Sequence, residues 1–230
     1  MLKVENISHI EIHTDAWRQG RLAKLTSSMI FTLMGDKMLT VEAVAYIYEK
    51  VGEELTGIPA KYEVDTPDTR WGLINEPDAI KKFGQWLGVE FLVTQVLILI
   101  PGSRFGSTPD CIWVKQKYGD AYDVATGEIK CYPNYTHYIK CALCETPEQL
   151  KAVDKKLYWQ VCDQMLMCGC MEGYAVLYHP DFRAGGFRVI KFRKMDMIDE
   201  FKLLAERKQL ALQKFDEFRD RLLNLKNPMP

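Results

Sequence analysis

The segment from Ser107 to Pro133 constrains the fold more than any other part of the chain. It contains two runs of strand-forming residues, Cys111–Val114 and Tyr122–Lys130, on either side of a turn-like Lys-Tyr-Gly-Asp. This pattern predicts a β-hairpin that folds back around Gly119.

The predicted hairpin brings charged residues together. A fold around Gly119 places Asp110 opposite Glu128, within a residue of register. Because side chains alternate along a strand, Glu128 and Lys130 share a face and Ile129 points the other way. The hairpin therefore gathers two carboxylates and one amine at one edge of a sheet. An ordinary charged hairpin face has the same local pattern, and the hairpin sequence alone does not decide between the two.

Helical patterns dominate the first ninety residues. We expect Thr26-Ser27-Ser28 to supply the N-cap of one helix, and Thr40 to cap another. A loop is expected over Lys61–Arg70, where prolines and scattered charges interrupt the pattern. The expected helices are Trp17–Lys24, Met29–Met34, Thr40 to about Glu54, and Asp78–Leu87.

The pattern changes at Val89. Val89–Ile100 is rich in Val, Leu and Ile and predicts a strand buried on both faces. The expected elements after the hairpin are one helix from Thr146 to Gly169, a last strand over Tyr174–Tyr178, and a long amphipathic helix over Met195–Leu225. The order helix, three strands, helix, strand predicts an α/β fold with a central mixed sheet flanked by helices. We expect a single domain, with a core at about 17–180 and a C-terminal helical extension at about 195–226.

Composition narrows the class of protein. The longest apolar run, Val96–Pro101, is too short to span a bilayer, and the first residues lack the pattern of a secretory signal. We therefore expect a cytoplasmic protein without a membrane partner. The net charge of −1 gives no global attraction to polyanions, but a local basic groove would still bind DNA.

The seven cysteines favour reduced thiols, since their number is odd and no export signal precedes them. Cys141-Ala-Leu-Cys144 and Cys168-Gly-Cys170 have spacings that can hold zinc or an iron–sulfur cluster. No second Cys-x-x-Cys pair accompanies them, so buried free thiols explain them better.

Carboxylates paired with an amine suit phosphodiester hydrolysis, which needs an aimed water and stabilisation of charge on phosphorus oxygens. Divalent metals supply both, and Mg²⁺ prefers oxygen ligands. In this interpretation Asp110 bridges two ions, and Glu128 with the backbone carbonyl of Ile129 completes one of them. Nearby metal ions would push Lys130 toward its neutral form, so that it orients or deprotonates the attacking water.

Pro109-Asp110 together with Glu128-Ile129-Lys130 resembles the PD-(D/E)-x-K nuclease signature. The surrounding segments, from about Trp17 to Pro180, are similar to the phage lambda-type exonucleases, the YqaJ-like viral recombinases. The further motifs that match in order are Trp17–Arg21 with Thr26-Ser27-Ser28, Gly72–Ala79, Lys130-Cys131-Tyr132-Pro133, and Tyr158-Trp159-Gln160.

The resemblance implies a restriction-endonuclease-like core and a metal-dependent exonuclease. Such an enzyme degrades one strand of linear duplex DNA from a 5′ end, in phage-type homologous recombination. The resemblance further implies Mg²⁺ as the cofactor, with Mn²⁺ as a substitute. It also implies a ring-shaped homotrimer that passes its single-stranded product to an annealing protein. A phage-encoded enzyme of this kind would work in the bacterial host cytoplasm.

The resemblance also implies roles for individual residues. It assigns catalysis to Asp110, Glu128 and Lys130, with support from Glu76 and Gln160. It assigns the 5′-phosphate pocket to Arg21, Ser28 and Thr108, with Arg104 as an additional DNA contact.

Two positions depart from the family pattern. Cys111 stands where a glycine usually follows Pro-Asp, and Pro77 directly follows Glu76. Because the residue before a proline is biased away from helical dihedrals, we expect Glu76 at the start of a helix. The alternatives that remain are another nuclease of the same fold, such as an endonuclease, a resolvase or an iron–sulfur strand processor, or a non-catalytic DNA-binding protein with an idle site.

Overall fold

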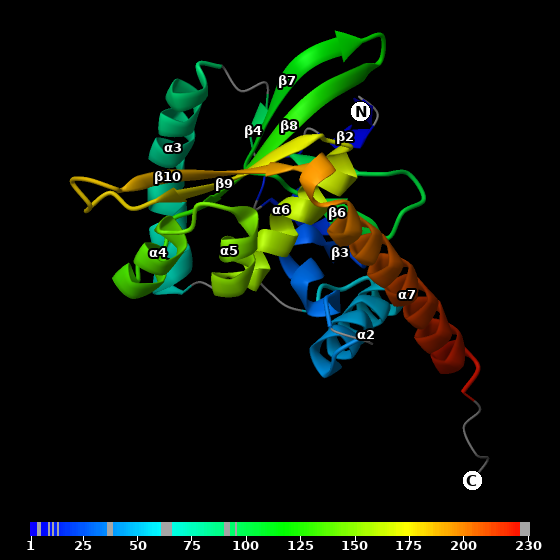
Figure 1. Ribbon diagram of the computed structural model, residues 1–230. Helices are drawn as coiled ribbons and strands as arrows, with labels where there is room; N and C mark the ends of the chain where they lie inside the picture. The colour runs from blue at the N-terminus through cyan, green and yellow to red at the C-terminus, as the bar shows by residue number, and fades with distance from the viewer. Residues whose placement is uncertain are drawn as a thin grey trace.

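A computed structural model of the chain describes residues 1–3, 6–8, 10, 12, 14–35, 39–60, 66–89, 93–94 and 96–225. Its centre is a mixed sheet with the strand order β10-β9-β8-β7-β4, and β1 also pairs with β8 (Figure 1). In this sheet β8 and β9 run parallel, and the other pairs are antiparallel. The strands are β1 (Leu2–Lys3), β4 (Val93–Thr94), β7 (Cys111–Tyr118), β8 (Ala121–Lys130), β9 (Glu172–Tyr178) and β10 (Phe187–Arg193). The predicted α/β class with a mixed central sheet is confirmed.

The predicted hairpin is present as β7 and β8, which project from the body of the molecule (Figure 1). Gly119 forms its turn with φ +56°, a conformation that glycine adopts at little cost. Cys111 pairs with Gly127, so Asp110, which directly precedes β7, lies opposite Glu128 as predicted.

Two helices cover opposite faces of the sheet, α3 (Pro67–Leu87) and α6 (Lys155–Cys168). The alternation of side chains decides which residue each helix meets. Ile129 packs in the apolar cluster on the α3 side, whereas Glu128 bonds to glutamines of α6 and to its strand neighbour Lys130. The expected division of this strand between its two faces is therefore confirmed.

Helix α3 packs tightly on the middle of the sheet. A Cβ added at Gly127 would lie 2.7 Å from both Cys111 Sγ and Phe83 Cε1, so only glycine fits beneath the phenylalanine ring. The buried apolar residues of this interface are Ala79, Phe83, Cys111, Trp113, Ala125, Ile129, Tyr174, Val176 and Tyr178. This close approach fixes the position of Gly127, the residue directly before Glu128.

The first long helices differ modestly from expectation. Helix α1 spans Asp15–Gly20 and begins after Thr14, whose side chain accepts the Trp17 N–H at 3.2 Å. Helix α2 spans Val41–Thr56, is capped by Thr40 as predicted, and ends at a left-handed Gly57.

A 3₁₀ helix over Ser27–Leu33 replaces the α-helix expected over Met29–Met34. The prediction that Thr26-Ser27-Ser28 supplies its N-cap side chains is wrong, because the hydroxyls have other partners. Thr26 Oγ1 contacts Ser28 Oγ at 3.2 Å, and Ser27 donates to Asp163 at 2.7 Å. Thr26 Oγ1 also lies 3.3 Å from the Tyr46 hydroxyl, so the long-range partners of these hydroxyls include Tyr46 and Asp163.

Helix α3 is the largest correction. It begins at Pro67 after a capping box between Thr66 and Thr69, so the expected loop ends before Arg70, and residues 61–65 lie outside the described part. Pro77 lies inside the helix, and Glu76 is therefore not at a helix start. Packing of the following turns on the sheet outweighs the local bias that a proline imposes.

The strand expected over Val89–Ile100 is divided between two sheets. Val93–Thr94 belongs to the central sheet, and β5 (Leu97–Leu99) belongs to a second one; residues 90–92 and 95 lie outside the described part. The second sheet has the order β2-β5-β6-β3. Its other strands are β2 (Ile7–Ser8), β3 (Leu25–Thr26) and β6 (Phe105–Ser107).

The single helix expected after Thr146 is two helices. Asp154 ends α5 (Pro147–Val153) and caps α6, because its side chain accepts the Leu157 N–H at 2.8 Å. Gly169 ends α6 in the left-handed conformation, as predicted.

Three further elements complete the chain. The strand over Tyr174–Tyr178 is not the last, since β10 pairs with it, and α4 (Tyr135–Ala142) was not anticipated. Helix α7 (Ile198–Leu223) runs past α2 toward the C-terminus (Figure 1), after a short 3₁₀ turn over Lys194–Asp196. None of the helices in the described ranges combines the length and apolar character that crossing a bilayer requires.

Candidate active site

A cavity of about 980 Å³ opens at the carboxyl end of β8, between α3 and α6. It is at the upper end of the roughly 300–1,000 Å³ usual for ligand sites. The predicted site residues that line it are Arg21, Ser28, Glu76, Thr108, Asp110, Ile129, Lys130 and Gln160. Segments far apart in the sequence therefore meet at one cavity.

Glu128 lies directly behind the cavity and is 2% exposed. Its Oε1 accepts hydrogen bonds from Lys130 Nζ and Gln160 Nε2, both at 2.5 Å. Its Oε2 accepts one from Gln164 Nε2, also at 2.5 Å. These charge-assisted bonds fix the carboxylate in one orientation.

Asp110 lies across the sheet edge from this carboxylate. Its Oδ2 accepts the backbone N–H of Ile129 at 2.6 Å. Burial first, and then the charges of Glu128 and Glu76, raise the pKa of Asp110 well above its usual value. Carboxylates that repel one another in a partly dehydrated site provide oxygen ligands for a divalent cation.

Lys130 is held as a cation by the protein groups around it. Burial lowers its pKa, but the charges of Glu128 and Asp110 outweigh burial, and the net pKa lies above the usual lysine value. The expectation that Lys130 becomes neutral depends on nearby metal ions, so it stays a prediction. Without them, Lys130 offsets part of the negative charge.

Helix α6 carries a polar row of which sequence reasoning identified only Gln160. Lys156, Gln160 and Gln164 are spaced by four residues and so share one helical face. Lys156 lines the cavity, and burial of its ammonium followed by the charge of Lys130 lowers its pKa, although much of the residue is exposed. The fourfold spacing is the signal that could have found Lys156 and Gln164.

The cavity is also lined by the residues expected to bind a phosphate. The guanidinium of Arg21 lies 4.1 Å from the ring centroid of Trp17, which also lines the cavity. Ser28 enters from the 3₁₀ helix, and Thr108 follows β6. A planar guanidinium beside two hydroxyls is a set of donors suited to phosphate oxygens.

A buried network holds this phosphate-facing segment in place. Ser27 Oγ donates to Asp163 Oδ2 at 2.7 Å and lies 2.8 Å from Ser107 Oγ, so it ties the 3₁₀ helix to β6 and α6. Asp163 also accepts a hydrogen bond from Lys208 of α7 at 2.5 Å. The C-terminal helix therefore anchors the segment next to Ser28.

Arg104 is not among the residues that line the cavity. Its guanidinium pairs with Glu54 and lies 3.5 Å from Asp216, and it stacks over the Phe215 ring at 4.0 Å. In this structure Arg104 fastens α7 to α2, and the expected contact with DNA stays a prediction.

The seven cysteines all lie in the described part and are all free thiols, six of them buried. Cys168 and Cys170 do not meet further cysteines in any compact ligand set of three or more among the described residues. The thiols therefore give no support to the iron–sulfur alternative.

The carboxylates of Asp110, Glu128 and Glu76 are close enough to affect one another's charge, and we call this group the acidic edge of the sheet. Together with Lys130 it resembles the site of the PD-(D/E)-x-K signature. The chain belongs to the YqaJ-like viral recombinase family, whose domain model matches residues 16–171. No curated protein sequence matches it significantly.

Solved structures share this fold. An alkaline exonuclease, LHK-Exo, from Laribacter hongkongensis is 21% identical, with a TM-score of 0.65 over 93% of this chain and 100% of that chain. The same protein in complex with dAMP gives 22% identity and the same TM-score over the same shares of both chains. A phage-related exonuclease from Haemophilus somnus 129PT is 16% identical, with a TM-score of 0.64 over 86% of this chain and 96% of that chain.

Proposed function

We propose that the protein is a metal-dependent 5′-to-3′ exodeoxyribonuclease that acts on the ends of linear double-stranded DNA. One observation carries the proposal: a single cavity is lined by Asp110, Glu76 and Lys130 and also by Arg21, Ser28 and Thr108. The family and the exonucleases of similar fold support the same activity.

The residues of the acidic edge fit a divalent cation. Asp110, Glu128 and Glu76 carry three formal negative charges, and Lys130 with Lys156 carry two positive ones, which leaves an excess of one negative charge. Asp110 and Glu128, with the carbonyl of Ile129, would hold Mg²⁺ or Mn²⁺, since hard cations prefer oxygen ligands. When bound, such ions activate water and stabilise charge on the phosphorus oxygens.

The chain's own residues orient the reaction. Gln160 and Gln164 keep the Glu128 carboxylate fixed, and Asp110 is fixed by the Ile129 amide. Lys130 would orient the attacking water and remove its proton. Arg21 with the two hydroxyls would hold the terminal 5′ phosphate, so that the next phosphodiester lies at the acidic edge and cleavage proceeds from the 5′ end.

Degradation of a labelled linear duplex tests the proposal. We expect the 5′-phosphorylated strand to shorten with Mg²⁺, no shortening in EDTA, and no cleavage of a closed circle. The closed circle has no end, so it remains intact under an exonuclease. Cleavage of the circle would instead identify an endonuclease of this fold. DNA binding without cleavage under any divalent metal would identify a non-catalytic protein.

Arg21→Ala should weaken the preference for a 5′-phosphate end over a 5′-hydroxyl end. A hydrogen bond to a charged group contributes about 1.5–3 kcal/mol, so we expect the preference to fall about tenfold to hundredfold. Competition between the two labelled ends measures it. Arg18→Ala is the matched control, since Arg18 lies on α1, three residues before Arg21, and pairs with the exposed Asp15. An unchanged preference in the Arg21 variant would refute the phosphate pocket.

We extend the proposal to the assembly. The resemblance to lambda-type exonucleases suggests a homotrimeric ring in the host cytoplasm that hands single strands to an annealing protein. The mass in solution tests the homotrimer, because a trimer of this 26.6 kDa chain differs clearly from a monomer. A monodisperse monomer under conditions of full activity would contradict the ring.

A further inference from the structure

A second group of metal-ligating side chains lies where α4 meets the start of α6. His137, Cys141 and Asp154 each offer one ligand atom, and these atoms all lie within 4.8 Å of one another. Among the described residues it is the one compact set of three or more His, Cys, Asp or Glu side chains. It contains nitrogen and sulfur, in contrast to the oxygen ligands of the acidic edge.

The backbone explains why these three side chains meet. His137 and Cys141 are four residues apart on α4 and therefore share one face of the helix. Asp154 caps α6 through Oδ1, which accepts the Leu157 N–H, and this leaves Oδ2 directed at His137. The imidazole, the thiol and the carboxylate thus converge from two elements.

The distances suit a tetrahedral metal. Asp154 Oδ2 lies 3.2 Å from His137 Nε2, and Cys141 Sγ lies 3.7 Å from the same nitrogen. With zinc bond lengths of roughly 2.0–2.3 Å, tetrahedral ligand atoms lie roughly 3.4 Å (N···O) and 3.6 Å (N···S) apart. Small movements of the side chains would therefore accommodate an ion.

Neighbouring groups already orient the ligands. Tyr132 donates its hydroxyl to Asp154 Oδ2, and its ring packs edge-on against His137 with centroids 4.4 Å apart. Hydrogen-bonded carboxylates and fixed imidazole rings are typical of the groups that surround metal ligands. Cys144 does not join the set, since its thiol is directed at the Lys140 carbonyl at 3.3 Å.

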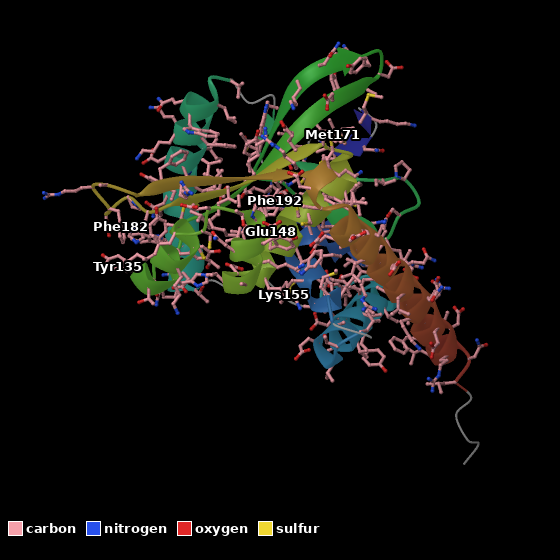
Figure 2. The ribbon with its side chains drawn as sticks, viewed as in Figure 1. Tyr135, Glu148, Lys155, Met171, Phe182 and Phe192 are labelled. Atoms are coloured by element: carbon pink, nitrogen blue, oxygen red, sulfur yellow. The ribbon has the colours of Figure 1, made fainter. Side chains whose placement is uncertain are left out.

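We propose that His137, Cys141 and Asp154 bind a divalent transition metal of the zinc class, with water as the fourth ligand. Thiolate and imidazole ligands favour such ions over Mg²⁺. Binding forms a metal–sulfur bond and releases the Cys141 proton to solvent. The ion would join α4 to the start of α6, and Tyr135 and Lys155 are the first residues of these two helices (Figure 2). Lys130, the last residue of β8, precedes α4 by a short segment, and Gln160 lies on α6.

Titration with Co²⁺ tests the site without relying on nuclease activity. The titration uses the whole 230-residue chain with the substitution Asp110→Asn, which weakens the acidic edge as a competing metal site. We expect one equivalent of Co²⁺ to give a sulfur-to-cobalt charge-transfer band with tetrahedral d–d absorption, and Zn²⁺ to abolish both. Cys141→Ser should lose the band, whereas Cys144→Ser and Cys131→Ser should retain it. Cys131 is included because it lines the cavity.

Because Cys141 is fully buried, Cys141→Ser can fail to fold, and a second variant then provides the test. His137→Gln keeps the thiol and alters a side chain that is 39% exposed. Zn²⁺ should raise the melting temperature of the parent protein but not that of His137→Gln.

Tyr132→Phe should weaken Co²⁺ binding about 10–100-fold, as the loss of a group that orients a ligand does. A parent protein without the band, or a band that depends on Cys131, would overturn the proposal.

Discussion

Asp110→Asn should lose DNA cleavage by more than about 10³-fold, because even one preorganised electrostatic group is worth about 10²–10³-fold in rate. The amide keeps the size of the carboxylate and can still accept the Ile129 N–H, so the change removes mainly charge. Time courses with linear 5′-phosphorylated duplex and Mg²⁺ measure the effect. Asp123→Asn is the matched control, since Asp123 lies on β8 but pairs with Gln116 of the hairpin, away from the cavity.

The stability of the same variant separates lost chemistry from lost folding. Burial, Glu128 and Glu76 raise the pKa of Asp110 in the folded protein. A carboxyl with a raised folded pKa lowers stability as the pH rises from its unfolded value of about 3.9 toward its folded value. Asparagine removes that cost. In EDTA at neutral pH the variant should therefore melt at a higher temperature than the wild type, and the difference should vanish below about pH 4.

A variant that cleaves DNA as well as the wild type would refute the acidic edge as the catalytic site. A variant that is inactive and also less stable at neutral pH would contradict the electrostatic account of Asp110. Inactivity combined with higher stability would mean that the charge is retained for chemistry at a cost to folding, as at many functional sites.

Local chemistry made the hairpin predictable. Glycine at the turn and alternating strand residues determine that Asp110 faces Glu128, and the pairing of Cys111 with Gly127 bears this out. The approach of Arg21 and Ser28 to the same cavity followed from the order of family motifs, and no local pattern contained it. Their distance from the acidic edge depends on how α1 and the 3₁₀ helix pack.

The errors arose where tertiary packing outweighed a local rule. Pro77 disfavours a helix at Glu76, yet packing of Phe83 on the sheet keeps α3 continuous. Asp154 resembles an ordinary polar residue of one long helix, but as a cap it divides the segment in two. Gln164 was overlooked because a glutamine beside an apolar stripe resembles surface, whereas in the structure it is fully buried against Glu128.

Lys208→Met should destabilise the protein by about 3–5 kcal/mol, the usual cost of leaving one partner of a buried ion pair uncompensated. Lys208 Nζ lies 2.5 Å from Asp163 Oδ1, and the two side chains are 9% and 0% exposed. Methionine retains most of the packing volume, so the loss reflects charge. The free energy of unfolding in urea, read at constant m-value, measures it.

The matched control is Lys214→Met on the same helix, where the pair with Glu217 is about 40% exposed on both sides. An exposed pair of this kind contributes about 0–1 kcal/mol. Adding Asp163→Asn to Lys208→Met should recover much of the stability, because it removes the uncompensated buried charge of Asp163. If Lys208→Met were as mild as the control, α7 would not anchor α6 through this pair.

Because Asp163 also accepts a hydrogen bond from Ser27, loss of Lys208 has a second expected consequence. Ser27 directly precedes Ser28, which lines the cavity, so the phosphate-facing segment should loosen as the pair is lost. Under conditions where Lys208→Met is still folded, its preference for 5′-phosphate ends should fall while Lys214→Met keeps the wild-type preference. The C-terminal helix lies outside the segment that the family model matches, and this link through Asp163 and Ser27 would make it part of how the protein recognises a DNA end.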